Sequence, residues 1–65
     1  MREVYFAVEN VPFMYDIDAG RLYEMTGGRQ EEVVNRLVVR KVRFHSTEIS
    51  LDNALELIRG TETMQ

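Results

Sequence analysis

The centre of the chain carries the residues best suited to binding chemistry. Four basic residues cluster there: Arg36, Arg40, Lys41 and Arg43. Phe44 follows them directly. Arginine and lysine hold phosphates while nucleobases stack on aromatic rings, so this pattern is a candidate nucleic-acid site. The same residues would also fit an ordinary amphipathic strand, whose charges discourage pairing at an exposed sheet edge. That interpretation is favoured.

Catalytic and metal-binding patterns are absent from the sequence. His45 is the only histidine, and its neighbours Ser46 and Thr47 would alternate faces on a strand rather than converge on it. Asp16 and Asp18 begin like a calcium loop, but the glycine and glutamate that such a loop needs are missing from their positions. We therefore expect no enzyme activity, no cofactor and no metal.

A protein-binding surface is predicted from the aromatic and methionine side chains. Both faces of the segment 4–8 are apolar, so a single sheet with helix on one side would leave apolar residues uncovered. Tyrosine and methionine are enriched at protein interfaces. The residues that we expect at an interface are Tyr5, Met14, Tyr15 and Tyr23.

Length and composition favour a small domain with a partner. A chain of 65 residues buries only about 60% of its unfolded surface, so small domains often add disulfides, metals or subunits. This chain has no cysteine, which leaves a partner as the expected support. The net charge is −3, with a mildly basic centre between acidic ends that could bring two copies together. No apolar run reaches the roughly 20 residues of a membrane span, and we expect a cytoplasmic protein.

The first half of the chain predicts strands. Segments 4–8, 13–17 and 22–25 are rich in strand-forming residues. The segment 9–12 is expected to be a turn, with Pro12 at a strand start or on an edge strand. Gly20 can adopt a positive φ, so it suits a short hairpin loop between the second and third strands.

The second half of the chain is less clear. Residues 29–37 are favoured as a helix and 38–46 as a strand, because one strand over 31–46 would exceed the usual length. A final helix follows Ser50, a good N-cap, with Leu51, Ala54, Leu55 and Ile58 spaced to form its buried face. Gly60 is expected just beyond its C-terminal end. Residues 1–60 are then one domain, and 61–65 a flexible tail.

These elements predict an α+β fold. We expect a small antiparallel sheet of three to four strands, with the C-terminal helix and an optional central helix packed on one face. A mostly β fold with one C-terminal helix is the second choice. The expected function is a non-enzymatic protein-interaction module, a homodimer that regulates or inhibits a larger cytoplasmic protein. The alternatives are nucleic-acid binding by the basic segment 36–43, or a subunit that works only within a homo-oligomer.

Overall fold

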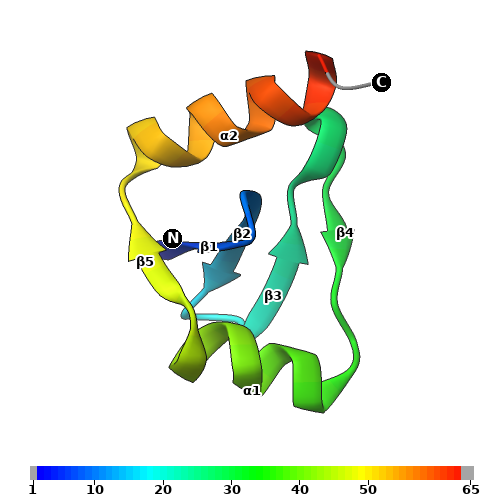
Figure 1. Ribbon diagram of the computed structural model, residues 1–65. Coiled ribbons are helices and arrows are strands. Elements are labelled where there is room, and N and C mark those ends of the chain that lie inside the picture. The colour runs from blue at the N-terminus through cyan, green and yellow to red at the C-terminus, as the bar shows by residue number, and fades with distance from the viewer. Residues whose placement is uncertain (1, 64–65) are drawn as a thin grey trace.

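A computed structural model describes the backbone of residues 2–63 and the side chains of residues 2–60. One antiparallel sheet has the strand order β4-β3-β2-β1-β5. Its strands are β1 (Glu3–Val8), β2 (Val11–Asp16), β3 (Arg21–Glu24), β4 (Glu31–Glu32) and β5 (Thr47–Ile49). The helices are α1 (Arg36–His45) and α2 (Leu51–Thr63), and a short 3-10 turn, η1, spans Thr26–Gly28 (Figure 1).

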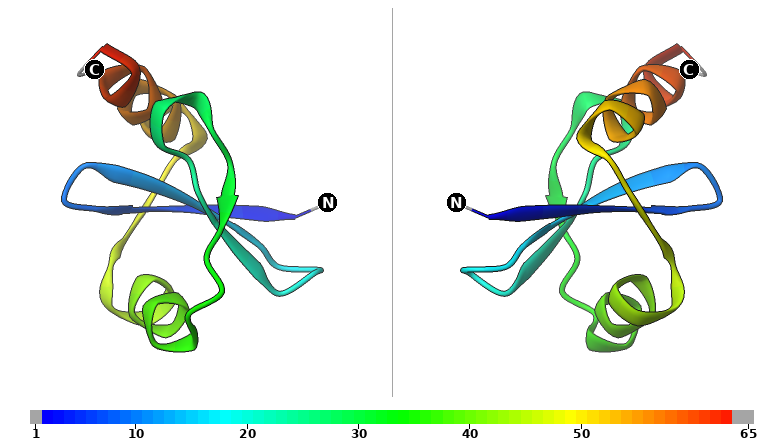
Figure 2. Two further views of the ribbon diagram at one scale, coloured as in Figure 1. Left: turned by 90° about the vertical axis from the view of Figure 1, so that its right-hand side faces the viewer. Right: turned by 90° about the vertical axis from the view of Figure 1, so that its left-hand side faces the viewer.

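The α+β class predicted from the sequence is confirmed. The sheet has five strands among the described residues rather than three or four, because two short strands, β4 and β5, extend its edges. The helices also differ in placement from the prediction that they share one face. Figure 2 shows α1 and α2 on opposite sides of the strands, so both faces of the sheet have helical cover.

The hairpin between β1 and β2 turns at two residues. Glu9 and Asn10 have φ values of 50° and 67°, and Val8 lies opposite Val11. Positive φ at both turn residues matches the right-handed twist of the strands that they connect. Pro12 is the second residue of β2, and its carbonyl accepts a hydrogen bond from the Met25 backbone N–H at 2.9 Å. The turn predicted over 9–12 is therefore confirmed for Glu9 and Asn10, whereas Val11 and Pro12 already belong to β2.

The hairpin between β2 and β3 confirms the glycine-containing loop. Gly20 has a φ of +68° and donates its backbone N–H to the Asp16 carbonyl at 2.8 Å. The Asp16 carboxylate accepts hydrogen bonds from the backbone N–H groups of Asp18 and Ala19 at 3.1 and 3.2 Å. Asp18 in turn pairs with Arg2 at 3.1 Å. These acidic residues stabilise the turn.

The sheet places one apolar group on each face. Phe6 lies opposite Phe13, and Tyr15 opposite Leu22, so these side chains share a face by the strand alternation. They form the main core together with Val42 of α1. Pro12 and Met14 alternate to the other face, where α2 contacts β2 and buries Ala54. Two covered faces explain how a chain this short packs most of its aromatic residues.

The expected helix over 29–37 and strand over 38–46 were wrong, because the order of helix and strand is reversed. Asn35 caps α1: its side-chain oxygen accepts hydrogen bonds from the backbone N–H groups of Leu37 and Val38 at 3.0 and 3.3 Å. Valines three positions apart, Val39 and Val42, then face the sheet once per helical turn. Capping by Asn35 and the burial of Val39 and Val42 outweigh the preference of valine for strands here.

The C-terminal helix begins as expected and ends later than expected. The Ser50 hydroxyl accepts a hydrogen bond from the Asn53 backbone N–H at 3.2 Å, which confirms the N-cap. The helix passes through Gly60 and reaches Thr63, so Gly60 does not end it. Leu51 and Leu55 are exposed, although their spacing placed them on the buried face. Of the expected flexible tail, 61–63 belong to α2, and residues 64 and 65 lie outside the described residues.

Candidate functional site

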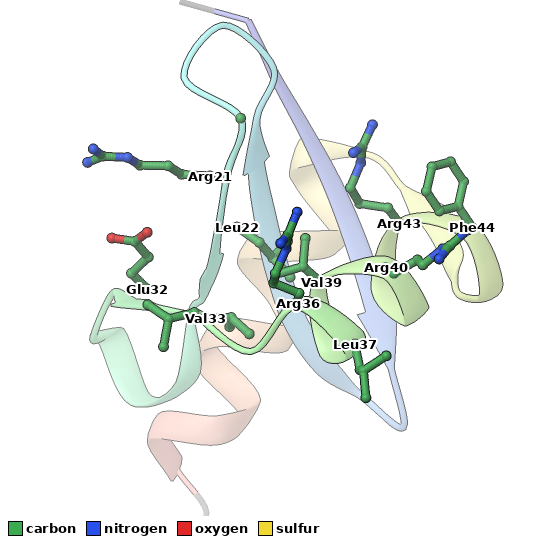
Figure 3. A pocket seen from close by; sticks show the side chains of 12 residues that line it. Arg21, Leu22, Glu32, Val33, Arg36, Leu37, Val39, Arg40, Arg43 and Phe44 are labelled. Atoms are coloured by element: carbon green, nitrogen blue, oxygen red, sulfur yellow. The ribbon is translucent and has the colours of Figure 1, made fainter.

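An open groove of about 540 Å³ runs along α1 (Figure 3). Its other wall is formed by the start of β3 and by the segment 32–34, which leads from β4 toward α1. Six side chains of α1 line it: Arg36, Leu37, Val39, Arg40, Arg43 and Phe44. The groove floor reaches the core at Leu22 and Val39, while its rim is open to solvent.

The apolar part of this groove is unusually accessible. Val34, Leu37 and Phe44 expose 79%, 78% and 64% of their surface. Helices of small domains usually turn such residues toward the core, yet α1 uses Val39 and Val42 for that purpose. The three side chains therefore contribute little to core packing and remain available for contact with another molecule.

The polar part of the groove is strongly basic. Arg21, Arg36, Arg40 and Arg43 line it, against a single acidic residue, Glu32. The one ion pair found among the side chains of residues 2–60 joins Arg2 to Asp18, so these four arginines have no carboxylate partner there. Figure 3 shows Arg36, Arg40 and Arg43 projecting from α1 and Arg21 from the facing strand. The groove is a local positive surface on a chain of net charge −3.

Arg43 is held by two aromatic rings. Its guanidinium carbon lies 4.3 Å from the centroid of the Tyr15 ring and 4.9 Å from that of Phe44. Both distances fall within the range of cation–π attraction. Tyr15 is a core residue and gives the guanidinium a fixed support. Stacking uses the faces of the guanidinium, so its N–H edge is left for hydrogen bonds.

The basic residues singled out in the sequence do come together, but on a helix. Arg36, Arg40 and Arg43 follow a spacing of four and three residues, which places them on one side of α1. Lys41 is exposed on the same helix but does not line the groove. The sequence pattern had placed Arg36 in a helix over 29–37, and Arg40, Lys41 and Arg43 on a strand over 38–46. It also missed Leu37, which a helix starting after Asn35 would have grouped with the arginines, and Arg21 and Val34, which only the tertiary structure brings beside them.

The residues predicted at a partner interface have a different distribution. Met14 and Tyr15 are 7% and 8% exposed, since α2 and α1 cover the two faces of the sheet, and they are out of reach of a partner in this fold. Tyr5 and Tyr23 are half-buried. The premise that one sheet face lies open was wrong, and an interface must be argued from other residues.

Tyr5 has its own polar partner. The Tyr5 hydroxyl donates a hydrogen bond to the Glu3 carboxylate on the same strand face. That hydrogen bond, assisted by burial and by the negative charge of Glu3, raises the pKa of Tyr5 to about 12. The neutral phenol is therefore retained far above neutral pH, and its role is structural rather than acid–base.

Other classes of site find no support in residues 2–60. No group of three or more histidine or acidic side chains there is placed to hold a metal ion. None of the helices described is both long and apolar enough to cross a membrane. Comparison with protein-family models, curated proteins and solved structures finds no match to this chain. The groove along α1 is thus the feature from which function is argued.

Proposed function

We propose that this chain is a small non-enzymatic interaction module that binds a larger cytoplasmic protein, as a regulator or inhibitor, through the groove along α1. The observation that carries the proposal is the exposure of Val34, Leu37 and Phe44 beside a line of arginines. Arginine and aromatic residues dominate the energetics of protein interfaces. Aliphatic side chains add apolar area, which contributes about 25 cal/mol per Å² when removed from water.

Self-association is a separate part of this proposal. Both edge strands are short, and β4 consists of Glu31 and Glu32. Short charged edges discourage pairing of sheets between copies. The exposed Leu51 and Leu55 on α2 offer an apolar surface for a homodimer instead. Sedimentation equilibrium of the wild type and of Leu51→Ser would test it, with weaker dimerisation expected for the variant. A dimer unaffected by Leu51→Ser would exclude this surface.

Nucleic-acid binding is the second candidate. It is favoured by the exposure of Arg36, Arg40, Lys41 and Arg43 on one short helix, and their phosphate contacts would give strongly salt-dependent affinity. Two observations rank it lower. Aliphatic residues such as Leu37 give no stacking platform for bases, and Phe44 is the one aromatic residue that lines the groove.

Affinity capture of tagged protein from native lysate separates these functions. The test compares wild type with the groove variant Leu37→Ser/Phe44→Ser and with the control Ile17→Ser, which alters an exposed apolar residue outside the groove. We expect a nuclease-resistant polypeptide in stoichiometric amount, lost with the groove variant and kept with the control. Loss of all bound material on nuclease treatment would favour the second candidate. Loss with the control alone would place the interface outside the groove, and self-association without any other polypeptide would indicate a homo-oligomer subunit.

A further inference from the structure

We infer that the groove along α1 is a carboxylate-binding site, and that its occupant is an acidic peptide segment of another protein with apolar side chains among its acids. This inference rests on the proposed function and names the chemistry of the partner. It begins with charge. Four arginines and one glutamate line the groove, and none of the four arginines has an ion pair among the described side chains. A segment rich in aspartate or glutamate supplies the complementary charge.

Arg43 is the anchor of this site. Its guanidinium lies against Tyr15 at 4.3 Å and against Phe44 at 4.9 Å, so its orientation is set before any ligand arrives. A planar guanidinium with a free edge binds a carboxylate through two parallel hydrogen bonds. Prior orientation lowers the entropy cost of forming them. Arg40 and Arg36, which precede Arg43 by three and seven positions on α1, extend the positive line for further acids.

Apolar contacts complete the description of the occupant. Val34 and Leu37 flank the arginines and are almost fully exposed, and they would be covered by aliphatic or aromatic side chains of the ligand. A nucleic acid satisfies the arginines but leaves these aliphatic residues without a matching surface. An acidic peptide with apolar side chains would contact both the arginines and the exposed aliphatic residues of the groove.

The test is selection of random short peptides displayed on phage against the immobilised full chain. Wild type is compared with Arg40→Gln/Arg43→Gln and with Arg59→Gln, an exposed arginine of α2 outside the groove. We expect wild type and Arg59→Gln to enrich peptides with more Asp and Glu than the starting library, together with apolar residues. The double variant should lose the acidic bias. Enrichment of apolar peptides without acids would overturn the carboxylate site while leaving the proposed docking groove intact. No enrichment at all would overturn both.

Affinity measurements then locate the anchor. The selected acidic peptide and its Glu→Gln, Asp→Asn counterpart are titrated by fluorescence anisotropy at low and high salt, beside single-stranded and duplex oligonucleotides. The acidic peptide should bind about tenfold more tightly than its amide counterpart, as expected for charge-assisted hydrogen bonds. Arg43→Lys keeps the charge but loses the planar fork, and should cost about tenfold. Because Arg43 also packs on Tyr15, Arg40→Gln provides a second variant without a ring contact. Equal binding of both peptides, or tighter binding of an oligonucleotide, would refute the inference.

Discussion

Replacing two leucines, one at a time, tests whether α1 packs on the sheet as described. Leu22 is 1% exposed and belongs to the core beneath α1, whereas Leu37 is 78% exposed on the solvent side of that helix. Truncation of each to alanine removes the same atoms from opposite environments. The difference between the two losses of unfolding free energy therefore reports the effect of burial alone, because both variants make the same chemical change.

The expected cost at Leu22 follows from its burial. Three carbon atoms at about 0.8 kcal/mol each amount to roughly 2.4 kcal/mol of lost transfer free energy. The cavity left among Phe6, Phe13, Tyr15 and Val42 adds to this, so we expect about 3 kcal/mol in total. A domain of this size has an unfolding free energy of roughly 3–10 kcal/mol, so Leu22→Ala should remove between about a third and all of it. Leu37→Ala should stay within about 0.5 kcal/mol of wild type.

Urea unfolding followed by far-UV circular dichroism gives both free energies. An unchanged dependence on urea would show that each variant unfolds from a native state of the same compactness. A cost below about 1 kcal/mol at Leu22 would refute the packing of α1 on this face. Equal costs at the two positions would indicate that residues 36–45 present another face to the sheet, as a strand there would. Leu37→Ala also separates stability from binding, since it should weaken partner capture while leaving the fold intact.

Three further predictions concern single residues. Gly20→Ala should destabilise the protein by about 1 kcal/mol because its φ is +68°, whereas Gly60→Ala should stabilise it by roughly 0.5–1 kcal/mol because Gly60 is helical and a Cβ there meets nothing within 4 Å. Asn35→Ala should cost about 1 kcal/mol through loss of the cap of α1. Tyr5 has a pKa of about 12, against 10.0 for a free side chain, so its contribution to stability is complete below pH 10 and is lost as pH rises through 12. Absorbance of tyrosinate, taken as wild type minus Tyr5→Phe, should show this ionisation, and Glu3→Gln should lower the pKa.

Each of these has a result that would contradict it. If urea unfolding showed that both glycine variants change the free energy of unfolding in the same direction, the turn at Gly20 or the helix at Gly60 would be contradicted. If Asn35→Ala left helix content and stability unchanged, Asn35 would not be the cap and α1 would begin elsewhere. Ionisation of Tyr5 near pH 10 in the wild type would show that its pKa is not raised, and would contradict the hydrogen bond to Glu3.

Local patterns in the sequence were enough to establish the class of the fold and several of its elements. Strands β1 to β3, the glycine turn at Gly20 and the N-cap at Ser50 depend on neighbours in the chain, through strand propensity, positive φ and side-chain capping. Such features can be read before any long-range contact is known.

The tertiary structure alone decided where helix and strand lie in the centre and what the basic residues do. Valine-rich residues 33–42 satisfy both periodicities, and the sheet that receives Val39 and Val42 selects the helix, at whose start the local cap at Asn35 lies. That choice turns Arg36, Arg40 and Arg43 to one side and exposes Leu37 beside them. It also covers the second sheet face, which removes Met14 and Tyr15 from the surface. The groove exists because helix packing, rather than local propensity, determined which side chains were left outside.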